Sequence, residues 1–151
     1  MLRQAFADRL KQAMKARETR TVSTIRLILA ALKDRDVAAR GRGNAEGLSD
    51  AEIQRMLQAM IKQRRESITL FEQGKREDLA QREGDEIAVI ESFLPRQLDQ
   101  AEIEAAVMAA IGKIGPVGIK DMGRVMGALR EHHEGVIDFA LAGAIVRRLL
   151  G

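Results

Sequence analysis

The sequence contains no cysteine, tryptophan or tyrosine, and only two prolines in 151 residues. Without cysteine, the chain cannot form disulfides, use a catalytic thiol or bind zinc through thiolates. Aromatic residues make up only 3%, so the core must consist of Leu, Ile, Val, Met and Ala, which favour helices. No apolar run approaches the roughly 20 residues of a membrane span. These absences predict a soluble, cytoplasmic protein that makes no contact with membranes.

The charges that are present are distributed unevenly. The net charge is +3, but residues 1–43 hold 11 Lys and Arg against 4 Asp and Glu. Residues 44–94 hold 7 against 11, and residues 95–151 hold 7 against 7. A basic excess of this kind indicates a polyanionic partner, although a solvated helix surface would also explain it. The candidate nucleic-acid contacts in this part are Arg35, Arg40 and Arg42, which lie beside a glycine-rich loop.

Apolar residues recur at helical spacing in four segments before Pro95. The first, residues 1–17, is basic like a weak transit peptide, but its apolar face favours a helix. Ser49 and Glu52 form a capping box at the start of the third segment. Because Pro95 lacks an amide hydrogen and restricts Leu94, the fourth helix should end there. The four predicted helices cover residues 1–17, from 19–24 to 40, from 50 to Gly74, and 76–94.

Three shorter helices are predicted after Pro95. Asp99 and Glu102 provide a second capping signal, and Asp138 can cap the last helix. A turn is expected at residues 115–118 and a loop at 132–135. The predicted helices cover residues 100–114, 122–129 and 139–150. No segment alternates at period two, so the fold class is all-α, with an N-terminal domain at residues 1–94 and a C-terminal domain at residues 95–151.

Three charged residues fall on apolar helix faces. With Ile53 at zero and 100° per residue, Arg64 lies at about 20°, inside the apolar stripe of its helix. With Leu79 at zero, Glu83 lies at about 40° and Glu86 at about −20°. Consecutive helices joined by a short connection are antiparallel neighbours, so we predict that Arg64 pairs with Glu83, Glu86 or both. The pair either fixes the helix register or belongs to a polar pocket in which two carboxylates perform acid–base chemistry.

A second basic group lies in the C-terminal part. Lys120 and Arg124 are one turn apart beside Gly123 and Gly127, which give that helix a smooth side, and Lys113 is close in sequence. This arrangement allows either close helix packing or contact with a nucleic-acid backbone. His132 and His133 are adjacent, and no further ligand completes a metal set, so we predict no metal site. Arg147 and Arg148 complement the dipole of the last helix.

Six stretches of the sequence carry a family resemblance: 25–27, 30–33, 62–67, 76–80 with Glu83 and Glu86, 93–98 and 120–127. Taken together they resemble the small bacterial GatB/YqeY-domain proteins along nearly the whole chain. The C-terminal part is similar to the tail of the GatB subunit of tRNA-dependent amidotransferases. The resemblance implies four N-terminal and three C-terminal helices, and a carbon–nitrogen ligase activity with glutamine as amide donor. It also implies that Lys120 and Arg124 contact tRNA.

The sequence does not show a complete catalytic set for this reaction. It has no thiol for a glutaminase, no Ser–Ser–Lys arrangement of an amidase and no phosphate-binding loop for ATP. No cofactor is indicated. We therefore expect a tRNA-binding or amidotransferase-associated accessory protein, whose partners are tRNA and a synthetase or amidotransferase subunit. Two alternatives remain open: a helical protein-interaction module, and a small enzyme that uses Glu83 and Glu86.

Overall fold

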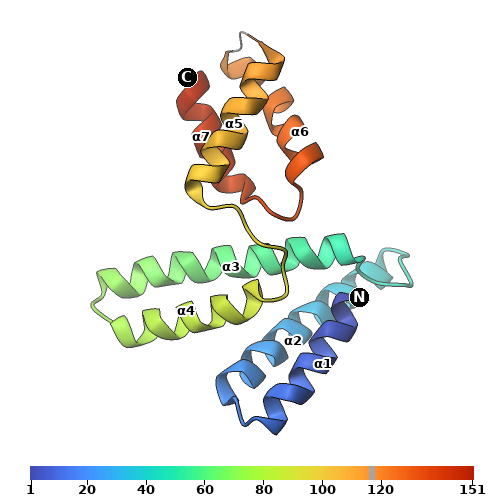
Figure 1. Cartoon of the computed structure of the whole chain (residues 1–151). Helices are drawn as coiled ribbons and strands as arrows, with labels where there is room; N and C mark the ends of the chain where they lie inside the picture. Colours follow the sequence, from blue (N-terminus) through green and yellow to red (C-terminus); the bar gives the residue numbers. More distant parts are fainter. Residues whose placement is uncertain (116–117) are drawn as a thin grey trace. The chain divides into compact units, whose positions relative to one another are not determined.

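A computed structural model describes residues 1–115 and 118–151 (Figure 1). This part of the chain contains seven α-helices and one 3₁₀ turn, and no strand, which confirms the predicted all-α class. None of these helices is both long enough and apolar enough to cross a membrane. The chain divides into two compact units, Met1–Leu94 and Pro95–Gly151, called the N-terminal and C-terminal units below. The turn predicted at residues 115–118 includes positions 116 and 117, which lie outside the described residues.

The N-terminal unit consists of two helical hairpins (Figure 1). In the first hairpin, α1 (Leu2–Lys15) packs against α2 (Thr19–Gly41). In the second, α3 (Asp50–Gln73) packs against α4 (Glu77–Glu91), and α4 also contacts α2. Phe6 of α1 meets Phe93 edge-to-face, with ring centroids 4.8 Å apart. The shared core contains Phe6, Ile28, Leu32, Ile53, Met56, Leu57, Ile61, Ile87, Ile90 and Leu94.

Capping explains where α3 begins. Ser49 accepts a hydrogen bond from the Glu52 amide, and the Glu52 carboxylate accepts one from the Ser49 amide, which confirms the predicted capping box. The end of α4 differs from the prediction, since the helix stops at Glu91 and not at Leu94. Phe93 and Leu94 donate their amides to carbonyls three residues earlier, so the chain tightens into a 3₁₀-type turn before Pro95.

The C-terminal unit is a bundle of three helices that all contact one another. They are α5 (Gln100–Ile114), α6 (Met122–His133) and α7 (Phe139–Leu150), and the short turn η1 (Ile119–Asp121) precedes α6. Asp99 completes a capping box with Glu102, and Asp138 accepts hydrogen bonds from two amides of α7, as predicted. The core contains Ile103, Val107, Val125, Met126, Leu129, Ile137, Ala142, Ile145 and Val146.

The loop predicted at residues 132–135 is wrong in its first half. His132 and His133 form the last turn of α6, and the helix ends before Gly135, whose φ of 85° favours glycine. Basic side chains are stable in a last helical turn because they complement the negative end of the helix dipole. The two histidines therefore extend the helix by one turn beyond Leu129.

Candidate functional site

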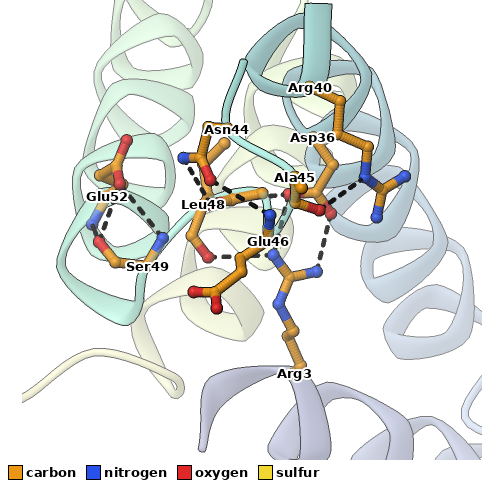
Figure 2. A network of polar contacts seen from close by, with 10 residues as sticks. Arg3, Asp36, Arg40, Asn44, Ala45, Glu46, Leu48, Ser49 and Glu52 are labelled. Atoms are coloured by element: carbon orange, nitrogen blue, oxygen red, sulfur yellow. Dashed lines mark hydrogen bonds and ion pairs between the residues drawn. The ribbon is translucent and has the colours of Figure 1, made fainter. Parts of the chain in front are cut away.

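An ion pair between Arg3 of α1 and Asp36 of α2 organises one end of the N-terminal unit (Figure 2). The Arg3 guanidinium donates two hydrogen bonds to the Asp36 carboxylate, of 2.7 and 2.9 Å, and a third of 3.0 Å to the Leu48 carbonyl. Asp36 is buried, and it also accepts a 2.9 Å hydrogen bond from the Leu48 amide. The bonds from Arg3 hold the pKa of Asp36 at about 2, against the opposing effect of burial.

The same pair fixes the loop between α2 and α3. Gly47 lies against Asp36 with a φ of 80°, and a Cβ at this position would come within 2.4 Å of the Asp36 carboxylate. Asn44 spans the loop, accepting from the Glu46 amide and donating to the Gly47 carbonyl (Figure 2). The glycine-rich loop between α2 and α3 is therefore held by hydrogen bonds at both Asn44 and Leu48.

A surface hollow lies where α2 ends and α3 begins. Its volume is about 320 Å³. Two of the predicted nucleic-acid contacts, Arg35 and Arg42, line it together with Arg55 of α3, which the sequence analysis did not select. The third predicted contact, Arg40, donates instead to the Ala45 carbonyl at 3.4 Å. The hollow, called the arginine hollow below, is lined by Arg35, Ala38, Arg42, Leu48, Glu52 and Arg55.

The opposite flank of α2 carries another row of cations. Arg26, Lys33 and Arg40 follow one another at intervals of seven residues, so they remain on one side of the helix. All three are exposed. Among the residues that the structure describes, neither Arg26 nor Lys33 forms an ion pair, and the same holds for Arg35 and Arg42. We call these four cations, which lie on two opposite flanks of the helix, the α2 basic surface: Arg26 and Lys33 on one flank, and Arg35 and Arg42 on the other.

Two further cations of the first 43 residues form ion pairs within the unit. Arg9 pairs with Glu18 at 2.7 Å, and Arg20 pairs with Asp85 of α4. The positive charge without a partner is thus smaller in the folded unit than the count along the sequence suggests.

The candidate residues of the C-terminal unit lie on different elements. Lys120 is exposed in η1, and Arg124 of α6 lies 3.6 Å from Asp121, which offsets part of its charge. Lys113 is on α5 and lines a groove of about 230 Å³ between α5 and α6, which His132 and His133 also line.

The two glycines of α6 face open space. Gly123 and Gly127 are exposed, and a Cβ at either position would meet nothing within 4 Å in the described part of the chain. Neither glycine is needed for helix packing within the C-terminal unit. The side of α6 that carries the two glycines is therefore an open surface of that unit.

Arg64 lies between α3 and α4, where it meets both predicted carboxylates. Its Nε is 2.9 Å from Glu86 and 4.0 Å from Glu83. Glu86 is buried, and Arg64 also donates to the Met60 carbonyl at 3.3 Å. The guanidinium occupies the space beside the Glu86 carboxylate and closes it to a substrate. The arrangement is that of an ion pair holding two helices in register, and not of an acid–base pair.

The model of the Yqey-like protein family matches residues 3–150, almost the entire chain. The chain belongs to this family. Among its curated relatives is the Lachancea thermotolerans protein named "Altered inheritance of mitochondria protein 41, mitochondrial", 33% identical over 100 residues, 65% of this chain and 51% of the relative. Proteins of the same name from Clavispora lusitaniae and Saccharomyces cerevisiae are 35% and 31% identical, over 56% and 63% of this chain and 46% and 49% of theirs.

The match to the Yqey-like family supports the resemblance inferred from the sequence. The chain spans about half the length of the curated relatives it matches. The names of those yeast proteins place them in mitochondria and describe an inheritance phenotype. The names mention no ligand or reaction. What this Yqey-like chain binds must therefore be argued from its own surface.

Proposed function

We propose that this protein is a tRNA-binding accessory factor of tRNA-dependent amidation, and that it contacts RNA phosphates through the α2 basic surface. The observation that carries the proposal is the set of exposed cations on α2 that form no ion pair with the described residues. Arginine and lysine at such positions suit phosphate contacts, and arginine can donate two parallel hydrogen bonds to one phosphate.

The aromatic residues favour a folded RNA over a single strand. Proteins that bind single strands stack bases on exposed aromatic rings. This chain has four phenylalanines and no other aromatic residue. Phe6 is fully buried, Phe93 and Phe139 pack against the two cores, and Phe71 of α3 is half-buried. Such a surface suits double-helical RNA, which proteins recognise by the positions of its phosphates and the shape of its helix. The body of a tRNA contains double-helical RNA of this kind.

The carbon–nitrogen ligase activity implied by the resemblance would then belong to a complex and not to this chain alone. We propose that a synthetase or amidotransferase subunit supplies the glutamine-dependent chemistry while this protein holds the tRNA. The closure of Glu86 by Arg64 speaks against a carboxylate-based activity of the chain itself. A cytoplasmic location remains part of this proposal, and the yeast relatives are named as mitochondrial.

The test is a titration of the full chain with tRNA at several salt concentrations. Binding through phosphates weakens steeply with salt, and the slope of log K against log salt reports the number of phosphates contacted. Lys33→Glu combined with Arg26→Glu should abolish most of the binding. Lys62→Glu, a charge reversal at an exposed lysine of α3, is the matched control and should retain it. Absence of tRNA binding at low salt would refute the proposal.

A protein-interaction role is the second candidate, and the groove between α5 and α6 is the observation that favours it. Four alanines, Ala106, Ala109, Ala110 and Ala128, line this groove beside Lys113 and the two histidines. Small side chains permit close approach of a partner helix. Capture of a protein partner that survives nuclease treatment and is lost in Ala109→Arg would favour this role over RNA binding.

A further inference from the structure

We propose that the arginine hollow binds a terminal phosphate monoester, either the 5′-phosphate of an RNA or that of a free nucleoside monophosphate. Binding of an RNA 5′-phosphate rests on the proposed function, whereas binding of a free nucleotide does not. The hollow is a concave surface lined by Arg35 and Arg42, which form no ion pair with the described residues, and it lies beside a loop that is held by hydrogen bonds.

The charge of the hollow favours an anion. Arg35 and Arg42 line it and form no ion pair with the described residues, and Glu52 is the acidic residue among its lining residues. The Glu52 carboxylate is held by the amide and the hydroxyl of Ser49, at 3.2 and 3.0 Å, and these bonds lower its pKa. Glu52 is thus fixed in the helix cap and offsets only part of the arginine charge. The forked guanidinium group matches the oxygens of a phosphate.

The shape of the hollow follows from the spacing on α2. Arg35, Ala38 and Arg42 share one side of the helix, and the small side chain of Ala38 leaves space between the two arginines. Leu48 adds an apolar wall. The volume of about 320 Å³ lies at the lower end of the range for small-molecule sites, which suits a phosphate with an attached nucleoside.

The wall of the hollow is fixed before any ligand arrives. The Leu48 amide donates to Asp36 and the Leu48 carbonyl accepts from Arg3, so both polar groups of this residue are held (Figure 2). Binding to a preorganised site loses less conformational entropy than binding to a mobile loop. The Arg3–Asp36 pair therefore serves as the support of the hollow.

A terminal phosphate fits this hollow better than an internal one. A monoester carries a charge of about −1.5 to −2 at neutral pH and three free oxygens, whereas an internal diester carries a single charge. Two arginines around one concavity match the higher charge of the monoester.

The experiment uses the full chain and two pairs of probes. The first pair is adenosine 5′-monophosphate and adenosine, and the second is a hairpin RNA with a 5′-phosphate and the same RNA with a 5′-hydroxyl. We expect the monophosphate to bind at least about tenfold more tightly than adenosine, and the phosphorylated RNA to exceed its partner by a similar factor. In the double variant Arg35→Gln with Arg42→Gln, the affinity ratio within each pair of probes should fall to about one.

Two controls separate the hollow from the rest of the surface. Arg26→Gln with Lys33→Gln should weaken both RNAs by the same factor and leave their ratio unchanged. Lys62→Gln should change neither the ratio nor the binding of the mononucleotide. Equal binding of adenosine and its monophosphate would overturn the hollow as a phosphate site. Binding of the monophosphate without any RNA binding would retain the hollow and refute the RNA function.

Discussion

Arg3 and Asp36 are 33 positions apart in the chain and share two hydrogen bonds of 2.7 and 2.9 Å. This pair connects the first turn of α1 to the end of α2, and through Leu48 it reaches the segment that leads into α3. One buried carboxylate thus joins three parts of the N-terminal unit. The stability of the first helix and the shape of the arginine hollow both depend on it.

Arg3→Ala should destabilise the N-terminal unit by about 2 kcal/mol. The reason is that Asp36 stays buried and charged while it retains only the hydrogen bond from the Leu48 amide. Hydrogen exchange of α1 and of the segment 43–48 is the measurement, because the chain has two units and a single denaturation curve would mix them.

Arg9→Ala is the matched control for that change. Arg9 lies on the same helix and also forms a 2.7 Å ion pair, but its partner Glu18 is exposed. Exposed pairs of this kind contribute roughly 0–1 kcal/mol. If both variants exchange at the same rates, burial of Asp36 does not carry the effect that we assign to it.

Gly47→Ala should perturb the same network from the loop. The added Cβ would lie 2.4 Å from the Asp36 carboxylate, and the φ of 80° is unfavourable for alanine. We expect a loss of about 2–3 kcal/mol, which combines backbone strain with displacement of the carboxylate. Gly43→Ala has a similar φ of 92° but open space around the Cβ, so it should lose only about 1 kcal/mol. Equal losses in the two variants would contradict this account.

Helical periodicity was sufficient to place Arg64 beside Glu83 and Glu86, because α3 and α4 are consecutive antiparallel helices with clear apolar stripes. The same projection would have found Asp36, which lies at about 20° from Ile25 on the buried face of α2. Its partner Arg3 is harder to predict, since the projection shows which face of a helix is buried but not which residues of the neighbouring helix lie at the same height. The Leu48 contacts could not be predicted, because they depend on the path of a loop.

The spatial arrangement of the predicted basic residues was also not available from the sequence. Counting charges along the sequence found Arg35 and Arg42 but could not show that Arg40 donates to a loop carbonyl. Nor could it show that Arg55, from a segment with an acidic excess, lines the same hollow. Likewise, it could not show that Lys113 lines a groove between α5 and α6. The position of a charge in the folded unit depends on helix packing, which local spacing does not determine.

Stability of the N-terminal unit should fall with acid because of Asp36. Its pKa is about 2 in the folded protein, lowered by the Arg3 guanidinium from an ordinary value of 3.8. A lowered folded-state pKa stabilises the fold above the unfolded value, and this contribution is lost as the pH falls from about 4 to about 2. Asp36→Asn removes that dependence. The free energy of unfolding of the two proteins should therefore converge as the pH falls through this window, and parallel profiles would refute the assignment.

Glu86→Ala should destabilise the N-terminal unit by about 3 kcal/mol, because it leaves Arg64 buried without its nearest carboxylate. Replacing both partners, as in Arg64→Met with Glu86→Leu, should recover much of the loss, since an apolar pair of similar size removes both charges. Glu91→Gln is the matched control. It removes the carboxylate of an exposed pair, 3.3 Å from Arg65 between the same two helices, and should cost less than about 1 kcal/mol.

The chain cut between Leu94 and Pro95 should yield two fragments that fold separately, because each unit has its own buried core. Residues 1–94 should retain the helical circular dichroism of α1–α4 and melt cooperatively. Residues 95–151 are near the lower size limit of a stable domain, so their melting temperature should be lower. If the fragments fold, the N-terminal one alone should bind tRNA with the salt dependence of the full chain. Binding that follows the C-terminal fragment would instead assign the phosphate contacts to Lys120 and Arg124.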